Sequence, residues 1–116
     1  MSQFAKTRNT KRRADVEALA SAIHQYTAGN RGVLPGGITA TLTPISNSGV
    51  NICSALVPRY LAALPQDPNS NEGARIPASQ CTGVYNTGYS VASTGNGHFR
   101  VTAPSAELSQ TIAEIR

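Results

Sequence analysis

The sequence has few of the residues from which catalytic and metal sites are usually built. It contains six acidic residues, two histidines, two cysteines and no tryptophan. It has no C-x-x-C pair, no G-x-S-x-G nucleophile elbow and no glycine-rich loop followed by lysine that would hold a phosphate. His24 and His98 lack a cysteine or acidic partner at ligand spacing, and both lie on expected polar faces. We therefore expect no catalytic site and no enzyme activity.

Long apolar runs are also missing. The longest run spans a few residues, whereas a helix that crosses a bilayer needs about 18 or more. Charged residues make up 14% of the chain and aromatic residues 5%, and the charged share is well below the usual quarter. A weakly charged chain rich in hydroxyl and amide side chains is typical of extracellular proteins. Its 116 residues are enough for a single domain, residues 1–116, with one modest core.

The net charge of +4 comes from one short segment. Residues 14–116 carry five arginines and six acidic residues, so this larger part has a net charge of −1. A nucleic-acid interpretation of the basic isoelectric point would therefore rest on the first 13 residues alone. Aromatic or amide side chains would be needed there to do more than bind phosphate, and Phe4 and Asn9 give this interpretation little support. The basic residues of this segment are Lys6, Arg8, Lys11, Arg12 and Arg13.

An amphipathic helix is predicted at the start of the chain. Val16, Leu19, Ala20, Ile23 and Tyr26 recur at helical spacing. Continued backwards, the same stripe meets polar residues at positions 12 and 9, although no glycine or proline interrupts residues 3–28. A helix of about 25 residues is about 38 Å long, more than so small a domain needs. We expect residues 14–28 to pack on the head of the domain and the basic residues 1–13 to protrude.

The clearest β pattern lies in the final third, within residues 82–116. Tyr89 and Val91 alternate with polar residues, as do Phe99 and Val101. Asn-Gly at 96–97 is typical of a two-residue hairpin turn between strands at about 88–94 and 98–103. A third strand is expected near residues 83–85, because a lone hairpin is marginally stable in water. The predicted core comprises Val16, Leu19, Ile23, Tyr26, Tyr89, Val91, Phe99 and Val101.

Weaker patterns describe the rest of the chain. In the loop region, residues 29–81, the β-branched residues at 38–45 indicate a short strand or an extended loop. Ser54 is placed to cap a short helix, and a helical turn is expected over residues 60–64 before Pro65. After Pro104, residues 105–115 fit either a short helix or a last edge strand, and we prefer the helix. The predicted fold class is α+β, with a long N-terminal helix on a small antiparallel sheet.

Cys53 and Cys81 are predicted to form a structural disulfide. The bridge would close a loop of about 29 residues and stabilise the fold by about 3–4 kcal/mol on the chain-entropy model. A redox pair is the alternative, but the C-x-x-C spacing is absent. A disulfide places the mature protein in an oxidising compartment.

Residues 67–73 resemble the start of a calcium loop. Asp67, Asn69, Asn71 and Glu72 supply oxygen-bearing side chains at close spacing. The EF-hand pattern needs glycine at its sixth position and glutamate at its twelfth, where this chain has Glu72 and Ala78. A polar turn is the simpler interpretation. Calcium is thus the one cofactor considered, and no other is expected.

Two segments resemble type IV pilins and the pseudopilins of type II secretion, some of which bind calcium in a loop of the sheet region. The first is the basic segment, Arg13-Ala14-Asp15, Leu19, Ala22, Ile23 and Tyr26, followed by Gly32 and Pro35; the second is Val57-Pro58-Arg59-Tyr60-Leu61 with Leu64-Pro65-Gln66-Asp67-Pro68. Together they cover about half of the chain. The resemblance implies a long helix that begins with a membrane-spanning half and ends inside a small β-rich head. The family's processing site and apolar half-helix are not in this sequence.

The resemblance implies a structural subunit of a pilus or pilus-like filament that acts by helical self-assembly. We expect a soluble part of a longer protein, with Met1 supplied for expression, an upstream segment anchored in the inner membrane before assembly, and a cell-surface filament afterwards. The basic segment would lie near lipid head groups and then contact copies of the chain and other pilins. The alternatives are a minor pilin that binds DNA or a surface ligand, a secretion pseudopilin, and an unrelated secreted enzyme or inhibitor. The expected subunit-interface residues are Lys6, Arg8, Lys11, Arg12, Arg13, Asp15 and Glu17, with Glu107 as a further acidic partner.

Overall fold

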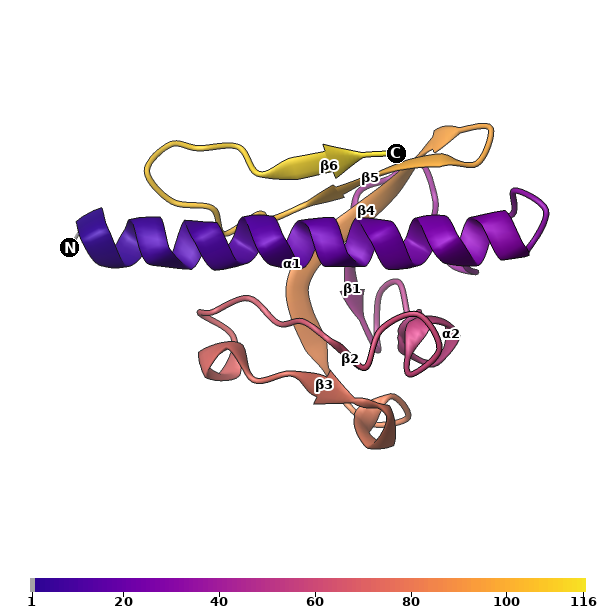
Figure 1. The fold of residues 1–116 in the computed structure, drawn as a ribbon, viewed down its shortest axis with the longest axis horizontal. Helices are drawn as coiled ribbons and strands as arrows, with labels where there is room; N and C mark the ends of the chain where they lie inside the picture. The colour runs from indigo at the N-terminus through magenta and orange to yellow at the C-terminus, as the bar shows by residue number, and fades with distance from the viewer. Residues whose placement is uncertain (1) are drawn as a thin grey trace.

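The computed structural model describes residues 2–116 and is built around one long helix. Helix α1 spans Ser2–Gly29, 28 residues, and runs along the longest dimension of a molecule that measures 45 × 30 × 21 Å (Figure 1). After α1, the N–H groups of Asn30 and Gly32 both donate to the carbonyl of Thr27, which closes the last turn. Gly32 has φ +82°, a conformation that favours glycine. The predicted helix is confirmed over its whole length.

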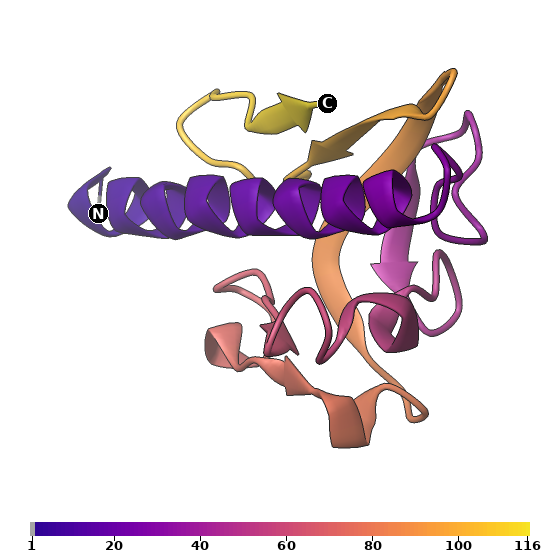
Figure 2. The ribbon, with the colours of Figure 1, turned by 45° about the vertical axis from the view of Figure 1, so that its right-hand side comes forward.

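A four-stranded antiparallel sheet lies against one face of α1 (Figures 1 and 2). Its order is β1-β4-β5-β6, with β1 at Thr43–Ser46, β4 at Asn86–Gly95, β5 at His98–Thr102 and β6 at Ala113–Ile115. The predicted hairpin is formed by β4 and β5. Asn96 and Gly97 at its turn have φ of +55° and +80°, as a tight hairpin turn with two left-handed residues requires.

Two β predictions need correction. The third strand is not at residues 83–85, because β1 occupies the edge of β4 opposite β5. The position of β1 supports the strand alternative for residues 38–45. The preferred C-terminal helix is also wrong, since residues 113–115 form the edge strand β6. Phe99 and Arg116 exchange both backbone hydrogen bonds at 3.0 Å, and Val101 lies opposite Glu114. A short helix would have left these β5 backbone groups without sheet partners.

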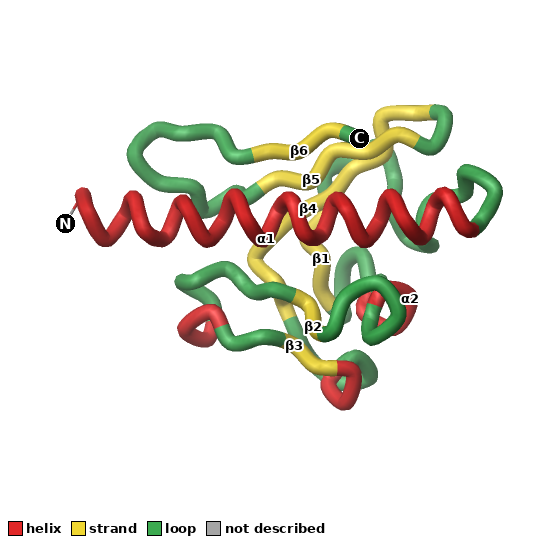
Figure 3. Tube along the Cα trace, viewed as in Figure 1, coloured by secondary structure: helices red, strands yellow, loops and turns green. Residues whose placement is uncertain are grey.

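Residues 53–81 of the loop region form a second, smaller unit on the other side of α1 (Figure 3). Helix α2 spans Cys53–Leu56, and β2 (Ala63–Leu64) pairs with β3 (Ile76–Pro77). Short 3-10 turns follow at Asn71–Gly73 and Ala78–Gln80. The predicted disulfide joins Cys53 to Cys81, with their Cα atoms 5.2 Å apart. The predicted helical turn at residues 60–64 is wrong: the turn after α2 lies at residues 57–60, and Ala63 and Leu64 form β2. A residue before proline favours extended backbone, and Leu64 precedes Pro65.

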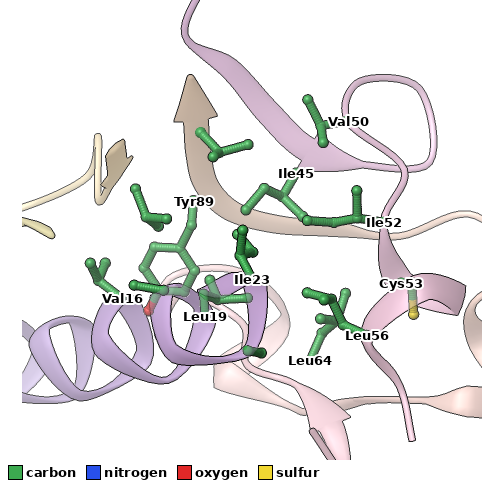
Figure 4. Close-up of a cluster of buried hydrophobic side chains, with 14 of the residues drawn as sticks. Val16, Leu19, Ile23, Ile45, Val50, Ile52, Cys53, Leu56, Leu64 and Tyr89 are labelled. Atoms are coloured by element: carbon green, nitrogen blue, oxygen red, sulfur yellow. The ribbon is translucent and has the colours of Figure 1, made fainter. Parts of the chain in front are cut away.

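The core lies where α1, the sheet and the disulfide-linked unit meet (Figure 4). Tyr26 is only partly buried and packs edge-on against Tyr60, with ring centroids 6.1 Å apart. The other seven predicted core residues are at most 2% exposed: Val16, Leu19, Ile23, Tyr89, Val91, Phe99 and Val101. The loop region adds the buried side chains of Ile45, Val50, Ile52, Leu56 and Leu64.

Candidate functional site at the basic half of the helix

The basic half of α1 is covered by two loops, residues 66–70 and residues 103–112. Arg12 is 0% exposed and Asn9 is 1% exposed, and Ala5 one turn earlier is also buried. The prediction that residues 1–13 protrude is therefore wrong for this face of the helix. Asn9 and Arg12 continue the buried stripe of Val16 and Leu19, with polar groups in place of apolar ones. Since a buried arginine must be paired, the surrounding loops have to supply acceptors.

Arg12 is held by acceptors from three parts of the chain. Its Nε donates to Asp67 Oδ2 at 2.8 Å and its Nη2 to Asp67 Oδ1 at 3.2 Å. Its Nη1 donates to Glu107 Oε2 at 2.7 Å and to Asn9 Oδ1 at 3.0 Å. The hydrogen bonds to Asp67, and then those to Glu107, raise the pKa of Arg12 above its ordinary value. Arg12 therefore connects α1 to both covering loops.

Glu107 attaches the C-terminal loop to α1 a second time. Its two carboxylate oxygens accept hydrogen bonds from Arg8 Nε and Nη2, both at 2.6 Å. The Asn9 amide donates to the Glu107 carbonyl at 2.9 Å and accepts from the Glu107 N–H at 3.0 Å. The hydrogen bonds from Arg8 and Arg12 lower the pKa of Glu107 to about 2, so the carboxylate is charged at neutral pH.

A second polar cluster centres on Asp15. Asp15 Oδ2 accepts hydrogen bonds from Lys11 Nζ and from the Tyr89 hydroxyl, both at 2.6 Å. Lys11 Nζ also donates to the Gln66 carbonyl at 2.8 Å. Burial, and then the hydrogen bond to Asp15, raise the pKa of the Tyr89 hydroxyl far above its ordinary value. Asp15 thus faces the head of its own chain and serves as an acceptor inside the fold.

Most of the expected subunit-interface residues are thus engaged within the chain. Arg8, Lys11, Arg12 and Asp15 form intrachain ion pairs, and Arg13 donates to Gln110. Glu107, expected as an acid of a neighbouring subunit, accepts from Arg8 and Arg12 of its own chain. Within residues 2–116, the exposed side chains of Lys6 and Glu17 form no ion pair. Sequence reasoning missed this site, although the sequence carried a signal for it. The helical spacing places positions 12 and 9 on the same buried face as Val16 and Leu19.

The four calcium-loop residues do not present their oxygens together. Asp67 is 1% exposed, and both of its carboxylate oxygens accept hydrogen bonds from Arg12. Asp67 Oδ1 also accepts the N–H of Asn69 at 2.8 Å, as in a polar turn. Asn69, Asn71 and Glu72 are exposed. No group of three or more histidine, cysteine, aspartate or glutamate residues that could hold a metal occurs in residues 2–116.

The two histidines are exposed, as their predicted polar positions require. No helix in the described part of the chain is long and apolar enough to span a membrane. No family model, curated protein or solved structure matches the chain. The structure itself shows an α+β domain in which a long N-terminal helix packs on an antiparallel sheet and a disulfide closes the loop region, an architecture compatible with a pilin-like fold.

Proposed function

We propose that the chain is the head of a structural subunit of a type IV pilus or pilus-like filament, which acts by assembly with copies of itself. The observation that carries this proposal is the position of α1. Its C-terminal half is in the core, whereas its N-terminal end lies at one end of the long axis of the molecule (Figure 1). An apolar segment that continued α1 upstream would therefore leave the head along the helix axis.

In this proposal the upstream segment holds the subunit in the inner membrane and later packs into the centre of the filament. The disulfide fits assembly outside the cytoplasm, because such bonds form in oxidising compartments. The polar network, formed by Arg8, Asn9 and Arg12 of α1 with Asp67 and Glu107, attaches the covering loops to the helix. Each subunit would therefore enter the filament as one rigid unit. Repeated contacts of one surface with a different surface of the next copy generate an open helical polymer.

A thiol-labelling experiment on cells tests the proposal. Both native cysteines are in the disulfide, so one added cysteine is the sole reactive thiol. Thr94→Cys, near the end of β4, and Ser79→Cys, in the 3-10 turn after β3, place that thiol at two exposed positions. Ala22→Cys, at a 1% exposed site, is the matched control. In cells that make the full-length protein, a thiol-reactive dye that does not cross membranes should label surface filaments in at least one exposed variant and none in the control.

Label that reaches the exposed cysteines only after cell lysis would contradict the filament proposal. Label found only on single, unassembled molecules would contradict it as well.

Two observations bear on the alternative functions, a minor pilin that binds DNA or a surface ligand through its loops and a secretion pseudopilin. DNA binding through the basic segment is disfavoured, because Arg8, Lys11 and Arg12 are paired with acids of the same chain. A calcium-binding pseudopilin would need the Asp67 carboxylate, which Arg12 occupies.

A further inference from the structure

The face of the four-stranded sheet that is turned away from α1 carries a groove of about 250 Å³. Arg100 and Thr102 of β5 line it, with Leu42 before β1 and the C-terminal loop, including Ala106 and Ile112. The groove adjoins the polar contacts of α1, because Gln110 lines it and accepts hydrogen bonds from Asn9 and Arg13. Arg100 and Thr102 take no part in those contacts. The groove is independent of the proposed filament function.

The register of the sheet explains why a groove forms there. Side chains alternate between the two faces of a strand, so Phe99 and Val101 point toward α1, and Arg100 and Thr102 point away from it. The cross-strand neighbours on this outer face are Ser90 and Ala113 beside Thr102, and Ala92 and Ile115 beside Arg100. Three of these four neighbours are small. They leave a hollow between Leu42 and the C-terminal loop.

Thr102 lines this groove and carries an unpaired polar atom. The residue is 6% exposed, and its Oγ1 is the one buried side-chain oxygen or nitrogen in residues 2–116 without a hydrogen-bond partner. An unpaired buried hydroxyl destabilises the fold, and valine would have the same shape without that penalty. A ligand in the groove that accepted a hydrogen bond from this hydroxyl would remove the penalty.

Arg100 supplies an unpaired positive charge to the same groove. Its side chain is exposed and forms no ion pair within the described residues, in contrast to Arg8 and Arg12. No acidic side chain of the described residues lines the groove. A guanidinium binds a carboxylate through two parallel hydrogen bonds. A hydroxyl two residues along the same strand lies on the same face and can donate a third.

We propose that this groove binds the carboxylate end of a short aliphatic group. Arg100 pairs with the carboxylate, Thr102 donates its hydroxyl hydrogen to it, and Leu42, Ala106 and Ile112 surround the aliphatic part. The small volume limits the buried part of the ligand to one short chain. A short-chain fatty acid and the C-terminal residue of a peptide that ends in leucine share this chemistry.

Amide chemical shifts of the ¹⁵N-labelled protein test the proposal by titration. The probes are hexanoate and acetyl-Ala-Leu with a free carboxylate, and the matched controls are hexanamide and acetyl-Ala-Leu amide. At least one carboxylate should produce saturable shifts at residues 100–112, with the millimolar affinity expected of so small a ligand. The uncharged control should bind about tenfold more weakly or worse. The carboxylate that binds more tightly identifies the source of the ligand.

Three variants separate binding from folding. Arg100→Gln should weaken carboxylate binding about tenfold, whereas Arg75→Gln, at an exposed arginine outside the groove, should not change it. Thr102→Val should weaken binding several-fold while Tm stays unchanged or rises, a combination that a purely structural threonine would not produce. Absent shifts with both carboxylates, equal binding of the amides, or equal affinities of the two arginine variants would overturn the proposal.

Discussion

Arg12 is the residue of α1 that contacts both covering loops, residues 66–70 and residues 103–112. Its partner Asp67 lies 55 positions later in the chain and its partner Glu107 lies 95 positions later. With Arg8, these side chains form a cluster of two cations and two anions, so the cluster is neutral as a whole. Burying the charges costs desolvation energy, which the ion pairs roughly offset. The contribution of Arg12 is therefore to fix the positions of the two loops on α1.

The effects of removing Arg12 and of removing Asp67 should not add. Arg12→Met leaves Asp67 buried without a counter-charge, and we expect a loss of about 3–5 kcal/mol of unfolding free energy. Asp67→Leu added to Arg12→Met should cost less than the sum of the single changes, because no uncompensated charge remains. Urea unfolding of the four proteins in this cycle measures the coupling.

Arg13→Met is the control for this cycle, since Arg13 is the exposed neighbour and should change stability by less than about 1 kcal/mol. Equal effects of Arg12→Met and Arg13→Met would show that the buried network does not fix the fold.

At the scale of elements, local sequence signals predicted α1 and the β4–β5 hairpin. The apolar spacing from Val16 to Tyr26 fixes the buried face of the helix, and Asn96-Gly97 fixes the turn. Both signals act over a few residues, so the rest of the chain is not needed to interpret them. The disulfide was equally direct, because the chain has only two cysteines.

The elements that sequence reasoning missed depend on partners far away in the chain. Residues 105–115 carry helical spacing, but the exposed edge of β5 offers backbone hydrogen bonds that a strand can satisfy. Likewise, the local sequence predicts a solvent-exposed Arg12, because its partners Asp67 and Glu107 are distant in the chain. The candidate site was therefore the least predictable part of the fold, since three separate segments build it.

The backbone of β4 packs closely against the Asp67 loop at Gly88. Gly88 has φ +80°, and a Cβ placed there would lie 2.6 Å from Asp67 Cβ and 3.1 Å from Ser70 Oγ. Gly88→Ala should therefore displace Asp67 from Arg12 in addition to straining the backbone, with an expected loss of about 2–4 kcal/mol. Thermal and urea unfolding measure it.

Gly95→Ala is the matched comparison, because Gly95 has φ +105° but open space around its Cβ. Its expected cost is about 1 kcal/mol, from backbone conformation alone. If the two alanine variants were equally stable, close packing of β4 on the Asp67 loop would be refuted.

At the scale of the molecule, α1 is held in two separate ways. Its C-terminal half is buried between the sheet and the disulfide-linked unit, whereas its basic half is held by polar contacts with the loops (Figure 2). Within the described residues, these intrachain contacts leave Lys6, Arg13 and Glu17 as exposed charges of α1 that form no ion pair. In the proposed filament, charged contacts between neighbouring helices would therefore depend on these three residues.

Hydrogen exchange should distinguish the polar attachment of the basic half of α1 from the apolar packing of its C-terminal half. Glu107→Ala removes the contacts of the C-terminal loop with Arg8 and Arg12 but leaves the apolar packing of Val16 and Ile23 intact. Amides of residues 8–13 should exchange about tenfold faster, whereas amides of residues 19–27 should keep their protection. Glu17→Ala, which removes an exposed carboxylate from the same helix, should change neither group. A uniform acceleration along α1 would instead mean that the helix opens as one unit and that the loop provides no separate support for its basic half.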